Sequence, residues 1–74
     1  MQAVLTIIPG VQPDLSDAAA LGAQMKAQGR IFDCRPAPSG GGLSVILKDG
    51  TSGPDRIAIA NEFKALGYAC IEVP

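Results

Sequence analysis

Hydrophobic and polar positions recur along this chain with two different periods, which divide it into short strand-like and helix-like segments. Aliphatic and β-branched residues dominate four segments, which predicts strands over residues 3–8, 30–35, 43–48 and 68–73. Between them, apolar residues recur at three- and four-residue spacing in two segments, which predicts two helices. The expected order of elements is therefore β-α-β-β-α-β.

The ends of both helices carry residues with suitable backbone chemistry. The first helix is expected to open at Pro13 and to end at Gly29 in a left-handed cap, and the second to run from Pro54 to Gly67. The apolar stripes that should face the sheet are Ala18, Leu21, Gly22 and Met25 in the first helix and Ile59, Ala60, Phe63 and Leu66 in the second.

Part of the chain is repeated, which strengthens this interpretation. Residues 25–30 are echoed by residues 63–68, and each copy follows a Pro-Asp pair. The order β-α-β-β-α-β with two similar halves is that of the α+β, ferredoxin-like fold. Right-handed crossovers and one hairpin then predict a four-stranded antiparallel sheet of order 4-1-3-2 with both helices on one face. We expect residues 1–74 to form one domain.

Alternation along the strands assigns their side chains to two faces. The side chains expected to meet the helices are Leu5, Ile7, Phe32, Cys34, Leu43, Val45, Leu47, Ala69, Ile71 and Val73. The opposite, open face is expected to carry Val4, Thr6, Ile8, Ile31, Asp33, Arg35, Ser44, Ile46, Lys48, Tyr68, Cys70 and Glu72.

The open face is the candidate functional surface. Its predicted centre is aliphatic and its margins are polar, which is typical of an interaction surface. The alternative is that β-branched residues favour strands whether or not anything covers them. The expected partner-binding residues on this face and its edges are Val4, Ile8, Ile31, Asp33, Arg35, Ile46, Tyr68 and Glu72.

Composition narrows the classes of function. A net charge of −1 provides no cationic surplus for nucleic acid, and the predicted first and third strands have no aromatic residue on which bases stack, so direct nucleic-acid binding is not expected. No apolar run approaches the roughly 18 residues of a membrane span. The first predicted strand begins almost at Met1, which leaves no room for a signal segment. We expect a cytoplasmic protein with no membrane contact.

The two cysteines and the charged residues have structural interpretations. Cys34 and Cys70 are expected on opposite edges and opposite faces of the sheet, too far apart for a disulfide. Cys34 is expected to be a small core residue and Cys70 an inert, partly exposed thiol. Each helix begins with acidic and ends with basic residues, as the helix dipole favours. Antiparallel helices should bring Asp14 and Asp17 towards Lys64, and Asp55 towards Lys26 and Arg30.

Catalysis is not expected from this sequence. The chain has no histidine and no C-x-x-C pair, so the commonest general base and a common metal motif are missing. The glycine-rich turn at residues 49–53 lacks the P-loop pattern, and Asp49 and Asp55 would repel phosphate. Acylphosphatases share the fold, but here the loop after the first strand has no arginine to hold a phosphate. We therefore expect no enzyme, no cofactor and no metal.

Three short segments resemble an ACT-type regulatory domain. They are Pro9-Gly10 after the first strand, Ala27-Gln28-Gly29 at the end of the first helix and Ala65-Leu66-Gly67-Tyr68 at the end of the second. Domains of that family bind amino acids or other small effectors at subunit interfaces. The resemblance implies an effector site near Pro9 to Asp14.

Two functions remain open at this stage. The first is a small non-enzymatic protein-binding module, an inhibitor or regulator that docks on a larger protein assembly. Small inhibitors carried by phages and mobile elements, including anti-CRISPR proteins, are similar to it in size and in their lack of motifs. The second is an ACT-like regulatory domain that binds amino acids. The expected partner is a larger protein assembly or a second copy of the chain.

Overall fold

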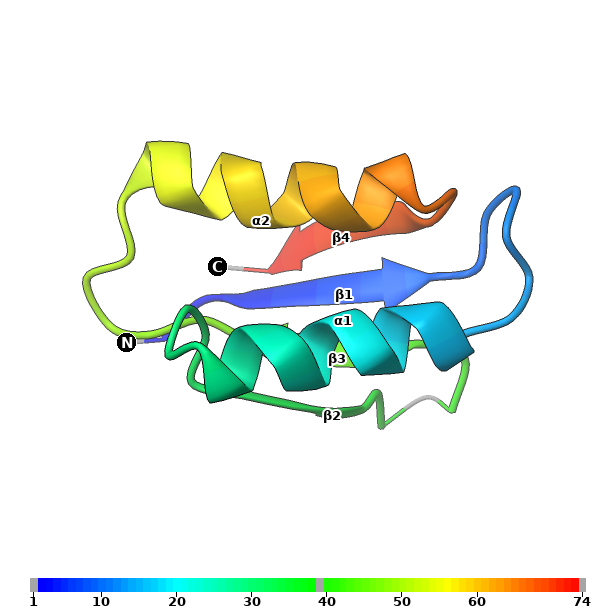
Figure 1. Ribbon diagram of the computed structural model, residues 1–74, viewed down its shortest axis with the longest axis horizontal. Helices are drawn as coiled ribbons and strands as arrows, with labels where there is room; N and C mark the ends of the chain where they lie inside the picture. The colour runs from blue at the N-terminus through cyan, green and yellow to red at the C-terminus, as the bar shows by residue number, and fades with distance from the viewer. Residues whose placement is uncertain (1, 39, 74) are drawn as a thin grey trace.

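Two β-α-β halves follow each other along the chain in the computed structural model, which describes residues 2–38 and 40–73 (Figure 1). In chain order the elements are β1 (Val4–Ile8), α1 (Ser16–Ala27), β2 (Asp33–Pro36), β3 (Leu43–Ile46), α2 (Gly53–Ala65) and β4 (Ala69–Val73). All six predicted elements are present. Strands β2 and β3 are shorter than expected because the chain leaves the regular ladder near both helices.

The strands form one antiparallel sheet with the order β2-β3-β1-β4, as predicted. Helix α1 packs over β2 and β3, and α2 packs over β4. Figure 1 shows both helices on the same side of the sheet, running in opposite directions. The fold is therefore α+β and ferredoxin-like, with one face of the sheet covered and the other open.

The covered face holds the core. From the strands it contains the alternate residues Leu5 and Ile7 of β1 and Leu43 and Val45 of β3, followed by Leu47, all almost fully buried as predicted. The helices add mainly Ala18, Met25, Ile59 and Phe63. Burial of these side chains supplies most of the stability of so small a domain. One residue of the predicted helical stripes, Leu66, is instead 40% exposed, because α2 ends at Ala65.

Helix α2 begins and ends as its sequence predicts. The Ser52 hydroxyl accepts a hydrogen bond from the Asp55 backbone N–H at 3.2 Å, and Pro54 occupies the first turn. Gly67 follows the helix with a φ of 98°, and Gly29 follows α1 with a φ of 74°. Both are left-handed conformations that glycine adopts without a steric cost.

Helix α1 begins at Ser16, three residues later than predicted. The Asp14 carboxylate accepts hydrogen bonds from the Ser16 backbone N–H at 2.9 Å and from the Ser16 hydroxyl at 2.7 Å, and these bonds lower the pKa of Asp14. They form a turn before the helix. The N–H of Ala18, in the first helical turn, finds its acceptor in the Tyr68 hydroxyl at 3.2 Å. Tyr68 thus caps α1 from the other half of the chain.

The facing of β4 differs from the prediction. The register pairs Cys70 with Ile7 and Glu72 with Leu5, which places positions 70 and 72 on the covered face. Tyr68, just before β4, is only 4% exposed, and its hydroxyl also donates to the Asp14 carbonyl. The placement of Tyr68, Cys70 and Glu72 on the open face is therefore wrong. The side chain of Glu72 itself lies outside the described part.

The opposite set of β4 positions belongs to the open face. The register pairs Ile71 with Thr6, Ala69 with Ile8 and Val73 with Val4, so these three positions were wrongly assigned to the core. Ile71 is 50% exposed. The sequence pattern led to the wrong assignment because one alternate set, Ala69, Ile71 and Val73, is more aliphatic than the other, Tyr68, Cys70 and Glu72. Burial of the large Tyr68 ring, together with its two hydrogen bonds, determines which side chains of β4 point towards the helices.

A second difference lies between α1 and β2. Ile31 is 1% exposed and belongs to the core, whereas Phe32 is 54% exposed. The prediction had these two residues the other way round, because it extended the strand alternation back to Arg30. Regular strand begins only at Asp33, so the period of two does not hold across the preceding turn.

Candidate functional site

The open face of the sheet contains a hollow over β1, β2 and β3. The hollow has a volume of about 370 Å³ and is lined by Val4, Thr6, Arg35, Pro36, Pro38, Ser44 and Ile46. Val4 and Ile46 are direct cross-strand partners, and so are Arg35 and Ser44. Side chains of cross-strand partners lie on the same face, so neighbouring strands build the hollow together.

The rim of the hollow comes from the β2–β3 connection. The Ala37 N–H donates to the Gly42 carbonyl at 3.0 Å, and the Gly40 N–H donates to the Ala37 carbonyl at 2.9 Å. Ala37 itself is only 6% exposed, so it anchors the turn. This places the rings of Pro36 and Pro38 beside the hollow. Two prolines around a small apolar residue are the sequence signal for this ordered apolar wall.

Arg35 stands at the margin of the hollow and is held by Asp33. Its guanidinium donates to the Asp33 carboxylate at 2.5 Å, and Asp33 also accepts from Lys26 of α1 at 2.9 Å. Both cations hold the pKa of the Asp33 carboxyl well below its ordinary value, and the hydrogen bond from Lys26 has the larger effect. Asp33 is thus a carboxylate at any physiological pH, and it orients Arg35 along the open face.

The structure places the eight predicted partner-binding residues in three groups. Val4, Arg35 and Ile46 line the hollow, and Asp33 lies next to it. Ile8 shares the open face at the far end of β1, where it pairs with Ala69. Ile31 and Tyr68 are buried in the core and Glu72 pairs with Leu5, so these three positions do not contribute to this face.

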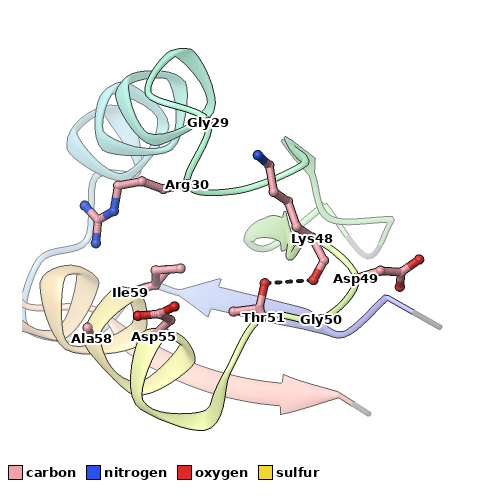
Figure 2. Close-up of a pocket in the computed structure, with 9 residues that line it drawn as sticks. All are labelled: Gly29, Arg30, Lys48, Asp49, Gly50, Thr51, Asp55, Ala58 and Ile59. Carbon is pink, nitrogen blue, oxygen red and sulfur yellow. Dashed lines mark hydrogen bonds between the residues drawn. The ribbon is translucent and has the colours of Figure 1, made fainter.

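A different kind of cavity lies at one end of the sheet, between the end of α1 and the start of α2. It has a volume of about 360 Å³, and Figure 2 shows the residues that line it. Arg30 and Lys48 contribute cations, Asp49 and Asp55 contribute carboxylates, and Ile59 contributes apolar surface. We call it the end cleft. The sequence only argued against a phosphate site at the turn of residues 49–53 and did not predict this cavity.

Arg30 forms one side of the end cleft and is engaged by Glu62 of α2. Its guanidinium donates to both carboxylate oxygens, one of them at 3.2 Å. The pairing raises the pKa of Arg30 and lowers that of Glu62. Asp55 adds to the rise in the pKa of Arg30, and both residues line the end cleft, as expected from the antiparallel helices. Lys26, expected in the same group, pairs with Asp33 instead.

The two cysteines lie on β2 and β4, the opposite edges of the sheet, and neither is in a disulfide. Cys34 contacts Gly22 of α1, and burial raises the pKa of its thiol, with Asp33 adding to the effect. A thiol with a raised pKa is a weak nucleophile. Cys34 therefore serves as packing, as predicted. Cys70 faces the helices as well, so the expected opposite facing of the two cysteines is wrong.

Within residues 2–38 and 40–73, no group of three or more His, Cys, Asp or Glu side chains is placed to hold a metal ion. Neither helix in this part of the chain is long and apolar enough to cross a bilayer. Comparisons with protein-family models, with curated proteins and with solved structures found no match to the chain. The geometry of the two cavities is accordingly the basis for any functional proposal.

Proposed function

We propose that this chain is a small non-enzymatic protein-binding module that docks on a larger protein through the open face of its sheet. The observation that carries the proposal is the hollow over β1, β2 and β3, with Val4, Ile46 and two prolines around it. An apolar depression with one charged side chain at its margin is suited to hold an apolar side chain of a partner. Among the described residues that line the hollow, Arg35 alone is ionisable, so the hollow favours binding over proton transfer.

The corrected facing of β4 supports the same surface. It brings Ala69 and Ile71 to the open face beside Ile8 and Thr6, where the sequence had predicted Tyr68 and Glu72. The apolar area of the open face thus continues from the hollow towards the β4 edge. Exposed apolar patches with polar rims mark interaction sites in soluble proteins.

The charges around the hollow point to the chemistry of the partner. Arg35 has a side chain that is 59% exposed although Asp33 holds it, so donor groups of its guanidinium remain accessible. The fitting partner presents an apolar side chain for the hollow and a carboxylate or carbonyl oxygen for Arg35. Arginine and aromatic residues supply many of the strongest contacts in protein interfaces.

Occupation of a surface on a larger assembly is the mode of action that we propose for this module. A module of this kind acts by covering a surface that another protein needs. Inhibitors carried by phages and mobile elements, including anti-CRISPR proteins, are modules of this type. The support for this finer assignment is the small size of the domain and the apolar hollow on its open face.

The second candidate function is an ACT-like regulator that binds a small effector in the loop after β1. The structure of that loop supports this function less well than docking. The Gln12 N–H donates to the Gly67 carbonyl at 3.0 Å. A Cβ atom on Gly10 would lie 2.7 Å from the same carbonyl oxygen. The loop after β1 thus packs directly against the turn between α2 and β4, which leaves little space for an effector near Pro9 to Asp14.

The test compares two isoleucine substitutions of the same chemistry. Ile46→Glu places a charge in the hollow, whereas Ile57→Glu places it on α2, where Ile57 is already 62% exposed. Both tagged variants and the original chain are used to capture proteins from a lysate of cells that carry the gene. Circular dichroism melting verifies that each variant is folded.

We expect the original chain and Ile57→Glu to retain the same protein, and Ile46→Glu to lose at least about a hundredfold in affinity for it, because a charged carboxylate replaces apolar surface in the hollow and competes with the partner for Arg35. Equal capture by both variants would overturn the proposal. Sedimentation of the purified chain is the second measurement. A dimer that Ile46→Glu alone dissociates would show that the open face pairs with a second copy and would overturn docking on a separate partner.

A further inference from the structure

The end cleft has two opposite charges on facing walls that belong to different elements. The Lys48 ammonium extends from the segment after β3 towards Gly29, and the Asp55 carboxylate lies on the other side of the cleft, on the first turn of α2 (Figure 2). Among the residues that the structure describes, no close ion pair joins these two groups or links either of them to a third residue, although the charge of Asp55 acts on Arg30 at longer range.

We propose that the end cleft binds a small zwitterion of the amino-acid type, with its carboxylate at Lys48 and its ammonium group at Asp55. This site is distinct from the hollow on the open face, and the inference does not depend on the docking function. A ligand with one positive and one negative group is attracted by both Lys48 and Asp55. A ligand with a single charge is attracted by one of these residues and repelled by the other.

The other charged residues of the end cleft leave these two roles to Lys48 and Asp55. The Arg30 guanidinium is already bound by both oxygens of Glu62. Figure 2 shows the Asp49 carboxylate pointing away from the other lining side chains. The Asp55 backbone N–H is bound to the Ser52 hydroxyl, so the start of α2 is capped by the chain itself and is not part of the proposed contact.

The walls of the end cleft are held by contacts within the chain. The Thr51 hydroxyl and backbone N–H both donate to the Lys48 carbonyl, at 2.7 and 3.1 Å, which closes the turn that carries Lys48. The Arg30–Glu62 ion pair joins the end of α1 to α2 on the other side. A site held open before binding loses less conformational freedom when the ligand enters.

The size and the floor of the end cleft fit a small metabolite. A volume of about 360 Å³ lies within the range of small-molecule sites. Ile59, which is 2% exposed, and Ala58 provide an apolar floor for the carbon atoms between the two charged groups. An inorganic phosphate would meet the Asp55 carboxylate, and a divalent cation would meet Lys48 and Arg30, so both fit less well.

Nuclear magnetic resonance titration of the isotope-labelled chain tests the site directly. The probes are L-alanine and β-alanine as zwitterions, with acetate and methylammonium as the matching single charges. We expect saturable shifts of the backbone amides of residues 48–51 and 55–59 with at least one zwitterion. Acetate and methylammonium at the same concentrations should bind at least about tenfold more weakly, since each lacks one charge-assisted hydrogen bond.

Two variants and two matched controls complete the experiment. Lys48→Gln and Asp55→Asn should each weaken zwitterion binding about tenfold or more. Lys64→Gln and Asp17→Asn remove the same charges at the other ends of the helices and should leave binding unchanged. The amide spectrum of each variant shows that it is folded. The inference is overturned if neither zwitterion gives saturable shifts, if the single charges bind equally well, or if the cleft variants bind like the controls.

Discussion

Replacing Tyr68 by Phe removes one oxygen atom that connects the two halves of the fold. In the structure this oxygen accepts from the Ala18 N–H at 3.2 Å and donates to the Asp14 carbonyl. Ala18 is 0% exposed, so water cannot replace the lost acceptor without opening the start of α1. The Asp14 residue is exposed, so its carbonyl is the easier group to satisfy again. The main cost therefore falls on the Ala18 amide.

The expected magnitude follows from that amide. A buried donor without a partner costs about 1–3 kcal/mol in the free energy of unfolding. A domain of 74 residues has a total of about 4–11 kcal/mol. Tyr68→Phe should thus remove a sizeable fraction of the stability, and the melting temperature should fall by about 4–8 °C for each kcal/mol lost.

Urea unfolding followed by circular dichroism measures this loss, and hydrogen exchange of the Ala18 amide locates it. Phe32→Leu, at a side chain that is 54% exposed, is the control and should change the free energy of unfolding by less than about 0.5 kcal/mol. The exchange rate of the Ala18 amide should rise in Tyr68→Phe and stay constant in the control. A variant with unchanged stability and unchanged exchange at Ala18 would refute the role of Tyr68 as a cap.

Three further results are expected. Phe63→Ala empties the centre of the core, where Phe63 is 0% exposed, and should cost about 3–5 kcal/mol, which moves the urea midpoint of unfolding to a clearly lower concentration; an unchanged midpoint would contradict this place of Phe63 in the core. Gly42→Ala places a Cβ atom 2.5 Å from a backbone carbonyl oxygen of β1 and should lower the melting temperature, whereas Gly41→Ala has nothing within 4 Å and should keep or slightly raise it; equal effects would contradict the close approach. The lowered pKa of Asp33 means that its contribution to stability is complete above about pH 4 and is lost as the pH falls through its folded pKa. The difference in unfolding free energy between the original chain and Asp33→Asn should consequently shrink on acidification, and a constant difference would argue against the pairing with Lys26.

The order of the strands and the facing of β1 and β3 were predictable because local patterns and general topological rules point to one arrangement. Leu5, Ile7, Val45 and Leu47 each have one polar neighbour (Thr6, Ser44 or Lys48), so the period of two assigns them to the buried face. Gly29 and Gly67 likewise mark both helix ends through their backbone freedom. These features depend on interactions close in sequence, which a single chain displays.

The facing of β4 was not predictable from the period, because both sets of alternate residues are partly apolar. What decides it is the contact of Tyr68 with the start of α1, and the sequence does not show which distant N–H lacks a cap. The two cavities have the same character. Prolines from a hairpin and a lysine from a turn form walls only once distant segments meet, so the hollow was predicted in part and the end cleft was missed.

The position of β1 in the sheet has a consequence for how the protein acquires its shape. Of the four strands described, β1 is synthesised before the others, and both of its neighbours, β3 and β4, come later in the chain. Its backbone groups therefore stay without strand partners until β3 emerges, while β2 and β3 join across a short connection of their own. Assembly should start from that local hairpin, with β1 inserted afterwards, since closure of short loops precedes closure of long ones.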